Sequence, residues 1–518
     1  MQMFSRREFM ATGLAGAALA SSGFGARRAL AESDPWKEEF DQALARDPSL
    51  LGWQGVSVDR LETPALEIEG HLPDELVGTF YRLGPGRHER SGKRYHHWFD
   101  ADGMIQAFRF DGTGIGHLGR FVATEKLAAE EKAGRFLYPG FGTSLAGGLA
   151  VTSPDAMNPA NINILSLGDE LLALWEGGSA HRLTPDTLET IGPKVWSRQL
   201  TGVPFSAHYK VEPDGHIWNF GTASGQNLLV LYHIRPDGTL VRGEGVALPE
   251  AAFMPAMVHD FAITERHLVF VFSPITYDRE AAGDGAFLDA FTWRPELGSR
   301  ALVVSKDDWS VRRWYELPSG FSFHFGNAWE DASGVIRFNY CVAEDSTVLT
   351  ETFREIMRGV KRPATGPTRF ARVTLGPDGG VAKQEISDFA AEFPRIAPAV
   401  VGRRHRWLYS LVGQTGNGYL AAHGAFRKTS IARHDLESGA LDTFSYGEDV
   451  IPEEHIFVAK PGSANEDEGW LIGTSLDTAA GVTRVSVFDA RHVSAGPIAQ
   501  GTLPYALPLG FHGQWRPA

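Results

Sequence analysis

The pattern that decides the fold is clearest in the stretch Leu228-Leu229-Val230-Leu231-Tyr232-His233-Ile234-Arg235-Pro236-Asp237-Gly238. Its first seven residues are apolar or aromatic with one exception, and a run of about 4–8 such residues is typical of a buried β-strand. The Pro-Asp-Gly that follows predicts a tight turn, because proline presets φ and glycine tolerates positive φ. A strand that ends in such a turn is expected to pair with the next strand of the chain.

The same pattern recurs along most of the sequence. Two further Pro-Asp-Gly turns are expected at 213–215 and 377–379. Strands spaced about 10–25 residues apart favour an all-β repeat architecture, such as a propeller, over βαβ units. The other strand-like runs lie at 170–175, 268–272, 301–305, 335–340, 370–375 and 470–476.

Helical periodicity is rare in this chain. One helix is expected near residues 37–45. A second is expected over 346–360, where an apolar stripe at helical spacing is formed by Leu349, Phe353, Ile356 and Met357.

Composition bounds the class of protein. The 518 residues would allow three or four domains, but also one large β-domain. A chain that is 43% hydrophobic and 22% charged is typical of a soluble globular protein, and its 58 glycines and 29 prolines fit many tight turns. No linker or low-complexity stretch divides the chain, so one domain is expected over 32–518. The net charge of −14 argues against nucleic acid as a partner, and the single cysteine, Cys341, excludes an intramolecular disulfide.

The first residues are typical of an export signal. Arg6 and Arg7 precede an apolar, glycine- and alanine-rich run over 11–24, and Ala29-Leu30-Ala31 offers a small-residue cleavage site. The run is too short to span a bilayer. We therefore interpret 1–31 as a twin-arginine signal, with the twin-arginine export machinery as a partner and a periplasmic or secreted destination. An ordinary secretion signal or an unstructured N-terminus is the alternative.

Four of the 18 histidines stand out by context, namely His208, His259, His324 and His512. Each is set among apolar or small residues at the start or end of a probable strand. They are 51, 65 and 188 residues apart, so no two come from one hairpin. A propeller brings inner strands to a common axis, where these histidines can meet. Imidazole suits iron, zinc, copper and nickel, and four neutral histidines would leave iron(II) with open positions for O₂. Spacing alone does not select these four.

Several longer stretches carry a resemblance to a known family. The clearest are Gly78-Thr79-Phe80-Tyr81-Arg82-Leu83-Gly84-Pro85-Gly86 and Phe511-His512-Gly513-Gln514-Trp515. Others lie at 97–104, 172–178, 206–208, 259–264 and 392–395. In this order they resemble the carotenoid cleavage oxygenases, which include apocarotenoid-, carotenoid- and stilbene-cleaving dioxygenases. The resemblance covers nearly the whole chain, from about Leu61 to Trp515.

The resemblance implies a fold and a metal centre. The fold is an all-β, seven-bladed β-propeller with a dome of loops and helices over one face. One Fe²⁺ per chain lies on the propeller axis, and its four ligands match His208, His259, His324 and His512. Three glutamates that support the ligands match Glu176, Glu392 and Glu454. The third match is the less secure, because Glu453 competes with Glu454 where the family has Glu-Pro.

The implied reaction is oxidative cleavage of a conjugated carbon–carbon double bond, with O₂ as co-substrate and two carbonyl products. The metal would be the redox centre and the protein would supply orientation and a dry tunnel. No catalytic residue beyond the metal centre is expected. His96, His97, Asp100 and Asp102 also lie close together in the sequence, but the resemblance makes them structural.

The substrate class depends on two positions. Stilbene-cleaving members hold a hydroxyphenyl group with a lysine directly before the first supporting glutamate and with a tyrosine. Here the matching residues are Trp175 and, by local match, Phe141. Aromatic residues suit an apolar polyene, which favours an apocarotenoid or carotenoid. The alternatives are ordinary packing of both residues, a stilbene- or phenylpropenoid-cleaving dioxygenase, a catalytically silent carotenoid-binding propeller, and an isomerase.

Family members often touch the membrane at the tunnel mouth. The segment 136–151, with apolar residues among glycines, is a candidate for such a peripheral contact. A buried dome loop is the alternative interpretation of the same segment.

Overall fold

The computed structural model describes residues 34–518 except 224–226, 249–256, 279, 281–282, 284, 363–365 and 414–428. The expected export signal at 1–31 lies outside the described residues. Among the described residues, no helix is both long enough and apolar enough to cross a membrane.

Strand runs and turns form where the sequence predicts them. The run 228–234 is strand β14 (Leu228–Ile234), which pairs antiparallel with β13 (Ile217–Ala223) and β15 (Leu240–Ala247). Gly238, in the turn after β14, has a φ of 84°, a value that residues with a side chain rarely adopt. The expected all-β class is confirmed: the described chain consists mostly of sheets, with few helices.

Six larger sheets make up most of the molecule. In hydrogen-bonded order, the first contains β1 (Arg60–Thr63), β7 (Ile115–Phe121), β6 (Asp102–Asp111), β3 (Val77–Arg87) and β34 (His512–Pro517). The second contains β11 (Thr190–Pro193), β10 (His181–Leu183), β9 (Glu170–Leu174) and β8 (Asn163–Leu167). The third contains β12 (Lys210–Val211), β13, β14 and β15. The fourth contains β16 (Phe261–Ile263), β17 (His267–Phe272), β20 (Ser299–Ser305), β21 (Arg312–Leu317) and β25 (Gly380–Val381).

The last two larger sheets complete the set. One has seven strands, β22 (Phe325–Glu330), β23 (Ile336–Val342), β24 (Arg369–Leu375), β26 (Lys383–Arg395), β27 (Trp407–Gly413), β28 (Thr429–Asp435) and β29 (Leu441–Ser445). The other contains β2 (Glu67–Gly70), β33 (Ala499–Thr502), β32 (Val482–Asp489), β31 (Gly469–Asp477) and β30 (Val450–Ala459). Two small hairpins pair β4 (Glu89–Arg90) with β5 (Lys93–Arg94) and β18 (Ile275–Tyr277) with β19 (Phe291–Trp293).

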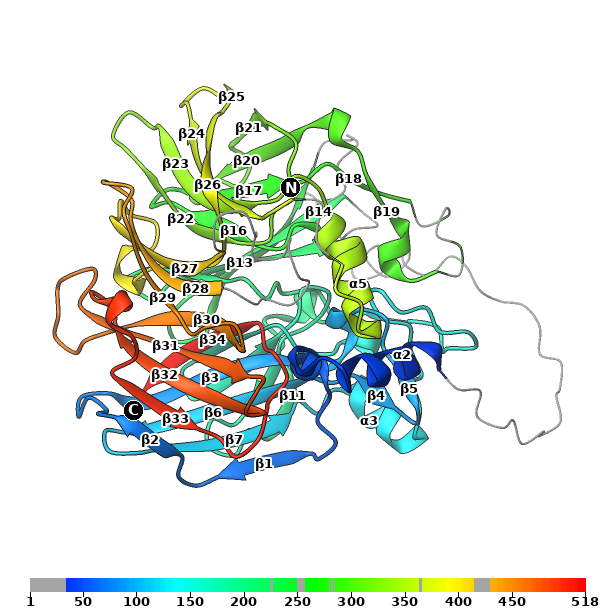
Figure 1. Ribbon diagram of the computed structural model, residues 1–518. Coiled ribbons are helices and arrows are strands. Elements are labelled where there is room, and N and C mark those ends of the chain that lie inside the picture. The colour runs from blue at the N-terminus through cyan, green and yellow to red at the C-terminus, as the bar shows by residue number, and fades with distance from the viewer. Residues whose placement is uncertain are drawn as a thin grey trace.

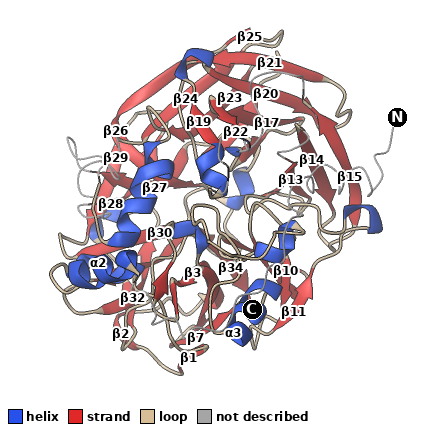
Figure 2. Ribbon diagram, turned by 90° about the vertical axis from the view of Figure 1, so that its right-hand side faces the viewer, coloured by secondary structure: helices blue, strands red, loops and turns tan. Residues whose placement is uncertain are grey.

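The sheets are arranged in a ring around a common centre (Figure 2). Strands from both ends of the chain meet in these sheets. The C-terminal strand β34 pairs with β3, and the N-terminal strand β2 pairs with β33. Sequence-distant segments thus share two neighbouring sheets, which fixes the C-terminal segment against the N-terminal one.

The α-helices lie together on one side of the ring, at the right of Figure 1. Helix α2 (Pro35–Leu44) confirms the helix expected near 37–45, and Asp34 caps its first turn. The segment expected to be one helix over 346–360 is helical from Val348 to Arg358, but it changes from π-helical through α-helical to 3₁₀ geometry. Its apolar stripe is buried, as expected. Helix α3 (Glu125–Ala133) was not predicted, because its charged sequence has little helical apolar periodicity.

Candidate metal centre

Four strands bring the four selected histidines to the middle of the ring. His208 and His259 each lie two residues before a strand, β12 and β16. His324 directly precedes β22, and His512 is the first residue of β34. Each of these strands is at the edge of its sheet. Because all four edges face the common centre and start at the same end, residues so far apart in sequence meet there.

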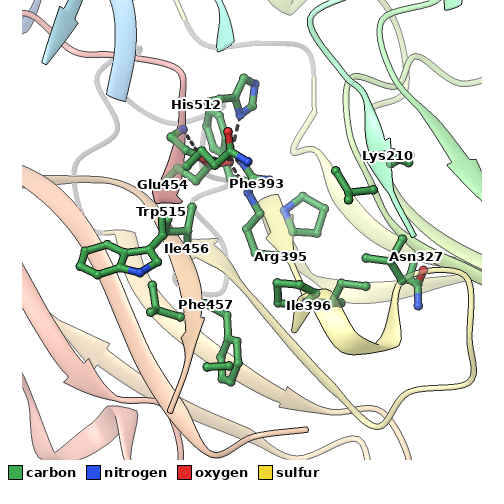
Figure 3. Close-up of a pocket in the computed structure, with 18 of the residues that line it drawn as sticks. Lys210, Asn327, Phe393, Arg395, Ile396, Glu454, Ile456, Phe457, His512 and Trp515 are labelled. Atoms are coloured by element: carbon green, nitrogen blue, oxygen red, sulfur yellow. Dashed lines mark hydrogen bonds and ion pairs between the residues drawn. The ribbon is translucent and has the colours of Figure 1, made fainter. Parts of the chain in front are cut away.

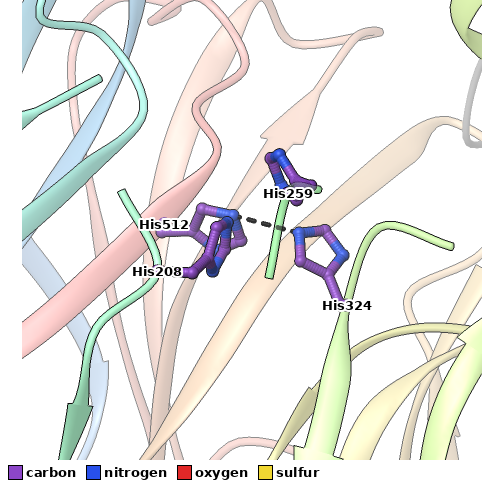
Figure 4. A group of neighbouring side chains, drawn as sticks. All are labelled: His208, His259, His324 and His512. Atoms are coloured by element: carbon purple, nitrogen blue, oxygen red, sulfur yellow. Dashed lines mark hydrogen bonds between the residues drawn. The ribbon is translucent and has the colours of Figure 1, made fainter. Parts of the chain in front are cut away.

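The four imidazoles form one buried cluster (Figure 4). One ring nitrogen of each lies within 4.8 Å of the corresponding atoms of the others. The Nε2 atoms of His324 and His512 are 3.2 Å apart. The rings of His208 and His259 have centroids 4.3 Å apart. Burial lowers the pKa of His512 to about 4 and holds that of His208 well below its usual range. These two rings are therefore neutral near pH 7 and can offer a lone pair to a metal.

Two of the histidines donate a hydrogen bond to a glutamate. His324 Nδ1 donates to Glu392 Oε2 at 2.5 Å, and His512 Nδ1 donates to Glu454 Oε1 at 2.9 Å. An ionised carboxylate only accepts, so the proton is on Nδ1 and the lone pair is on Nε2. Two lone pairs that face each other at 3.2 Å repel, and this arrangement suits a cation between them.

The third glutamate lies against His259. Glu176 Oε1 is 2.9 Å from His259 Nδ1, and the carboxylate is 27% exposed. His208 differs, since its Nδ1 is 3.9 Å from Asp260 Oδ1. Its buried Nε2 has no hydrogen-bond partner among the described residues. An unpartnered buried nitrogen inside a cluster of imidazoles is the state expected of a metal ligand.

Glu454, rather than Glu453, faces the cluster. Glu453 points elsewhere, where its carboxylate accepts from Thr474 Oγ1 at 2.7 Å and from Gly510 N at 2.6 Å and pairs with Arg82. Burial alone would raise the pKa of Glu454, but Arg395 and His512 outweigh burial and hold it well below its usual range.

Comparison with known proteins assigns the family. The model of the family described as retinal pigment epithelial membrane protein matches residues 57–517. The chain is 34% identical over 472 residues to the apocarotenoid-15,15'-oxygenase of Synechocystis, covering 87% of this chain and 92% of that protein. The chain belongs to the carotenoid cleavage oxygenase family.

Other members of this family extend the comparison. Lignostilbene-alpha,beta-dioxygenase isozyme III of Sphingomonas paucimobilis is 28% identical over 495 residues, covering 92% of this chain and 99% of that protein. The crystal structure of the cobalt-substituted Synechocystis apocarotenoid oxygenase matches with a TM-score of 0.82 at 31% identity, over 91% of this chain and 98% of that chain. These oxygenases confirm the expected enzyme class, a dioxygenase that cleaves carbon–carbon double bonds, and a propeller-like fold.

An apolar cavity touches the metal centre on the helical side. Its volume is about 40 Å³, and His259, His324 and His512 form its floor. Glu392 also borders the cavity, and the other walls are apolar, namely Trp98, Phe99, Ile162, Phe323, Phe353, Phe393 and Phe511. The sequence did not predict that these aromatic residues line a cavity, although Phe323 and Phe511 directly precede two of the selected histidines.

Trp175 and Phe141 are not among the residues that line this cavity. Phe141 packs one layer further out, with its ring centroid 6.0 Å from that of Phe99 in the cavity wall. Trp175 pairs through its backbone with Phe205, and its ring packs over Gly177. Their expected contact with substrate stays a prediction.

A larger cavity of about 640 Å³ runs from the metal centre among the inner strands (Figure 3). His208, His324 and His512 border it, as do Lys210 and Arg395. The cluster therefore lies between a small apolar cavity and a wider, partly polar one.

The second group of titratable residues, at 96–102, is structural, as expected. Asp100 accepts from Thr143 Oγ1 at 2.5 Å and from Gly142 N at 3.2 Å. His97 Nε2 is 2.9 Å from the Leu349 carbonyl oxygen, to which it donates. These contacts attach the segment around residue 142 to the helical segment at 348–358. Within the segment 136–151, Phe136 and Leu137 are buried and Leu149 is exposed. The burial of Phe136 and Leu137 favours the interpretation of this segment as a dome loop.

Proposed function

We propose that this chain is a non-haem iron(II) dioxygenase that cleaves a conjugated double bond of an apocarotenoid or carotenoid. The observation that supports this proposal is the cluster of four buried imidazoles within 4.8 Å. His208, His259, His324 and His512 would hold one Fe²⁺ through neutral ring nitrogens. When bound, the iron supplies the redox chemistry by which O₂ and an alkene become two carbonyl products.

The other residues have positioning roles in this proposal. Glu392 and Glu454 hold the Nδ1 protons of His324 and His512, which keeps the Nε2 lone pairs directed at the metal. Glu176, whose Oε1 is 2.9 Å from His259 Nδ1 without an aligned hydrogen bond, would support His259 after a small rotation of its carboxylate. The aromatic walls of the small cavity exclude water and offer stacking surface to a polyene.

The fold of this enzyme would be a seven-bladed propeller built from residues 32–518 as one domain. Support comes from the seven-stranded sheet, in which the long strand β26 pairs with β24 through its first part and with β27 through its last. That sheet then contributes two blades, and the other five larger sheets contribute one each.

Apolar surroundings favour a polyene over a hydroxystilbene as substrate. Among the described residues that line the small cavity, beside the three histidines and Glu392, all are apolar or aromatic and none offers a phenol or an ammonium group; the relative with 34% identity is named an apocarotenoid oxygenase. The lignostilbene dioxygenase, at 28% identity, keeps a stilbene as the second candidate.

The test is a paired incubation under O₂ of an apocarotenal and a 4-hydroxystilbene with iron-loaded protein, followed by identification of the aldehydes. We expect the apocarotenal to be cleaved, with about one iron per chain, whereas cleavage of the stilbene alone would contradict the substrate. His259→Ala removes a ligand and His216→Ala removes a histidine outside the centre. Absence of iron, with equal activity in both variants, would refute the dioxygenase. Turnover retained without O₂ would indicate an isomerase instead.

We further propose export through the twin-arginine route to the periplasm. The support is the Arg6-Arg7 pair before the apolar run of residues 11–24. Arg6→Lys together with Arg7→Lys is expected to retain the protein in the cytoplasm, as judged by fractionation. Export unchanged by this double substitution would refute the route. Peripheral membrane contact through 136–151 stays a prediction, which vesicle sedimentation of the wild-type protein would check.

A further inference from the structure

Strand β26 ends in the tetrapeptide Glu392-Phe393-Pro394-Arg395, which contains a bulge. Glu392 lies opposite Leu411 of β27, whereas Arg395 lies opposite Tyr409, so three steps on one strand match two on the other. Residues three apart on a regular strand face opposite sides of the sheet. The extra residue brings Glu392 and Arg395 to the same side, toward the metal centre.

Phe393 at the bulge has a backbone conformation that phenylalanine rarely adopts. Its φ is 55°, in the left-handed region, which costs a residue with a side chain about 1–2 kcal/mol. Backbone strain of this kind is concentrated at functional sites, where the surrounding structure enforces it. Here the ring of Phe393 lies against two of the histidines, with centroid distances of 4.9 Å to His324 and 5.4 Å to His512.

The two ends of the tetrapeptide reach different ligands. Glu392 accepts the Nδ1 proton of His324 directly. Arg395 acts at one remove: its Nε and Nη2 donate to Glu454 Oε1 and Oε2 at 2.7 and 2.8 Å, and Glu454 accepts from His512 (Figure 3). This two-point contact fixes the plane of the carboxylate as well as its position.

Arg395 also holds the backbone beside His512. Its Nη2 donates to the carbonyl oxygen of Gly513 at 3.3 Å, and Gly513 N donates to Glu454 Oε2 at 2.9 Å. In the part of the chain that the structure describes, neither Glu176 nor Glu392 forms an ion pair with a lysine or arginine. Among the three supporting glutamates, this two-point clamp is specific to Glu454.

We propose that Arg395 is a positioning residue of the metal centre, which orients the His512 imidazole through Glu454. Arg395 and Glu392 both lie on the bulged end of β26. This one strand end therefore determines how His324 and His512, whose Nε2 atoms are 3.2 Å apart, are placed relative to each other. This inference rests on the proposed metal centre. It differs from a purely structural role for Arg395, because it requires that the effect of Arg395 on the metal pass through Glu454.

The test is a cycle of variants with Co²⁺ as the probe, since its visible absorption reports coordination geometry. Wild type, Arg395→Met, Glu454→Gln and the double variant are freed of metal, and Co²⁺ affinity is measured by chelator competition alongside the spectrum. Arg433→Met is the matched control, because Arg433 pairs with Asp467 away from the centre. Melting of each apoprotein shows whether it has folded, and Arg395→Lys keeps the charge while losing the two-point contact.

We expect Arg395→Met to weaken Co²⁺ binding by about 10–100-fold and to shift the spectrum, as is usual when a group behind a ligand is removed. In the Glu454→Gln background the same substitution should change affinity by less than about 3-fold, since the path to His512 is already cut. Arg395→Lys should fall between wild type and Arg395→Met, and Arg433→Met should match wild type.

Two results would overturn the inference, namely equal Co²⁺ affinity and spectrum in wild type and folded Arg395→Met, or equal losses in both backgrounds. A wild-type protein that binds neither Co²⁺ nor Fe²⁺ would refute the proposed metal centre itself, so the two failures are distinguishable.

Discussion

Lys126→Met is expected to be among the most damaging single substitutions outside the metal centre. Lys126, on α3, donates through Nζ to Asp102 Oδ1 at 2.6 Å and to Tyr95 OH at 2.7 Å, and it lies 3.4 Å from Glu130 Oε2. Arg90 completes the group, with Nη2 3.1 Å from Asp102 Oδ2. The charged side chains of this group are at most 7% exposed.

The expected loss in the free energy of unfolding follows from the balance of charges in this buried group. Two cations face two carboxylates, so the intact group is neutral and each charge is compensated. Methionine keeps most of the apolar volume but leaves one buried carboxylate charge without a counter-charge. Removing one partner of a buried ion pair costs about 3–5 kcal/mol, which is a large share of the 5–15 kcal/mol that stabilises a typical domain. We expect the free energy of unfolding to fall by about that amount.

The chain contains a matched control. Lys37 and Asp41 on α2 form an ion pair at 2.7 Å with the same four-residue spacing as Lys126 and Glu130, but their side chains are 29% and 54% exposed. Exposed pairs of this kind contribute about 0.3–0.5 kcal/mol. Lys37→Met should therefore cost less than about 1 kcal/mol by the same measurement.

Urea unfolding followed by tryptophan fluorescence compares the two variants, since the chain has 13 tryptophans. Equal, small losses of free energy in Lys126→Met and Lys37→Met would refute the reasoning from burial. A further check is Lys126→Met with Asp102→Asn, which restores charge balance. Its loss should be smaller than the sum of the two single losses, and a strictly additive loss would show that charge compensation does not stabilise this group.

Three further outcomes are expected elsewhere in the chain. Burial raises the pKa of Asp100 to about 6, so the folded state favours the protonated form. The stabilisation that this gives is lost as pH rises from about 4 through 6. In urea unfolding, the free energy of unfolding of the wild type should therefore fall by about 2–3 kcal/mol relative to Asp100→Asn between pH 4 and 7. Gly142→Ala would place a Cβ 2.4 Å from that of His97 and should cost about 1–3 kcal/mol in thermal unfolding, whereas Gly376→Ala meets no atom within 4 Å and should be near neutral. Cys341 is buried and its thiol pKa is well above the usual range because of burial, so it should resist alkylation in the folded protein and react only after unfolding.

Most of the fold could be predicted from local sequence patterns, namely apolar runs and the turn residues that follow them. The run at 228–234 coincides with β14, and the run at 470–476 lies within β31, because period and turn chemistry act over a few residues. Helix α3 shows the limit of this reasoning. It is held in place by the buried ion pairs of Lys126 and Glu130 rather than by an apolar stripe, and that signal lies in partners distant in sequence.

The choice between Glu453 and Glu454 shows why the site was harder to predict. Alternation along a strand would separate the two, but the register of β30 shifts between Pro452 and His455. Residues 450–458 are all buried, so burial does not separate the two carboxylates either, and only their partners distinguish them. Arg395 belongs to one of the stretches that carry the family resemblance, yet the sequence predicted no role for it. The side to which its side chain points depends on the bulge at Phe393, whose φ is positive. The residue type at this position does not predict a positive φ.

The four histidines are alike in burial but unlike in support. His259, His324 and His512 each have a carboxylate within 2.9 Å of Nδ1. Asp260, the carboxylate near His208, is 3.9 Å away and is occupied by Lys210 at 2.8 Å and by the backbone nitrogen of Phe325 at 2.8 Å. A carboxylate partner makes an imidazole a stronger donor and fixes its angle. His324 and His512 are therefore strengthened by a hydrogen-bonded carboxylate. Glu176 lies beside His259 without an aligned hydrogen bond, and His208 has no carboxylate that close, so the ring of imidazoles is inherently asymmetric.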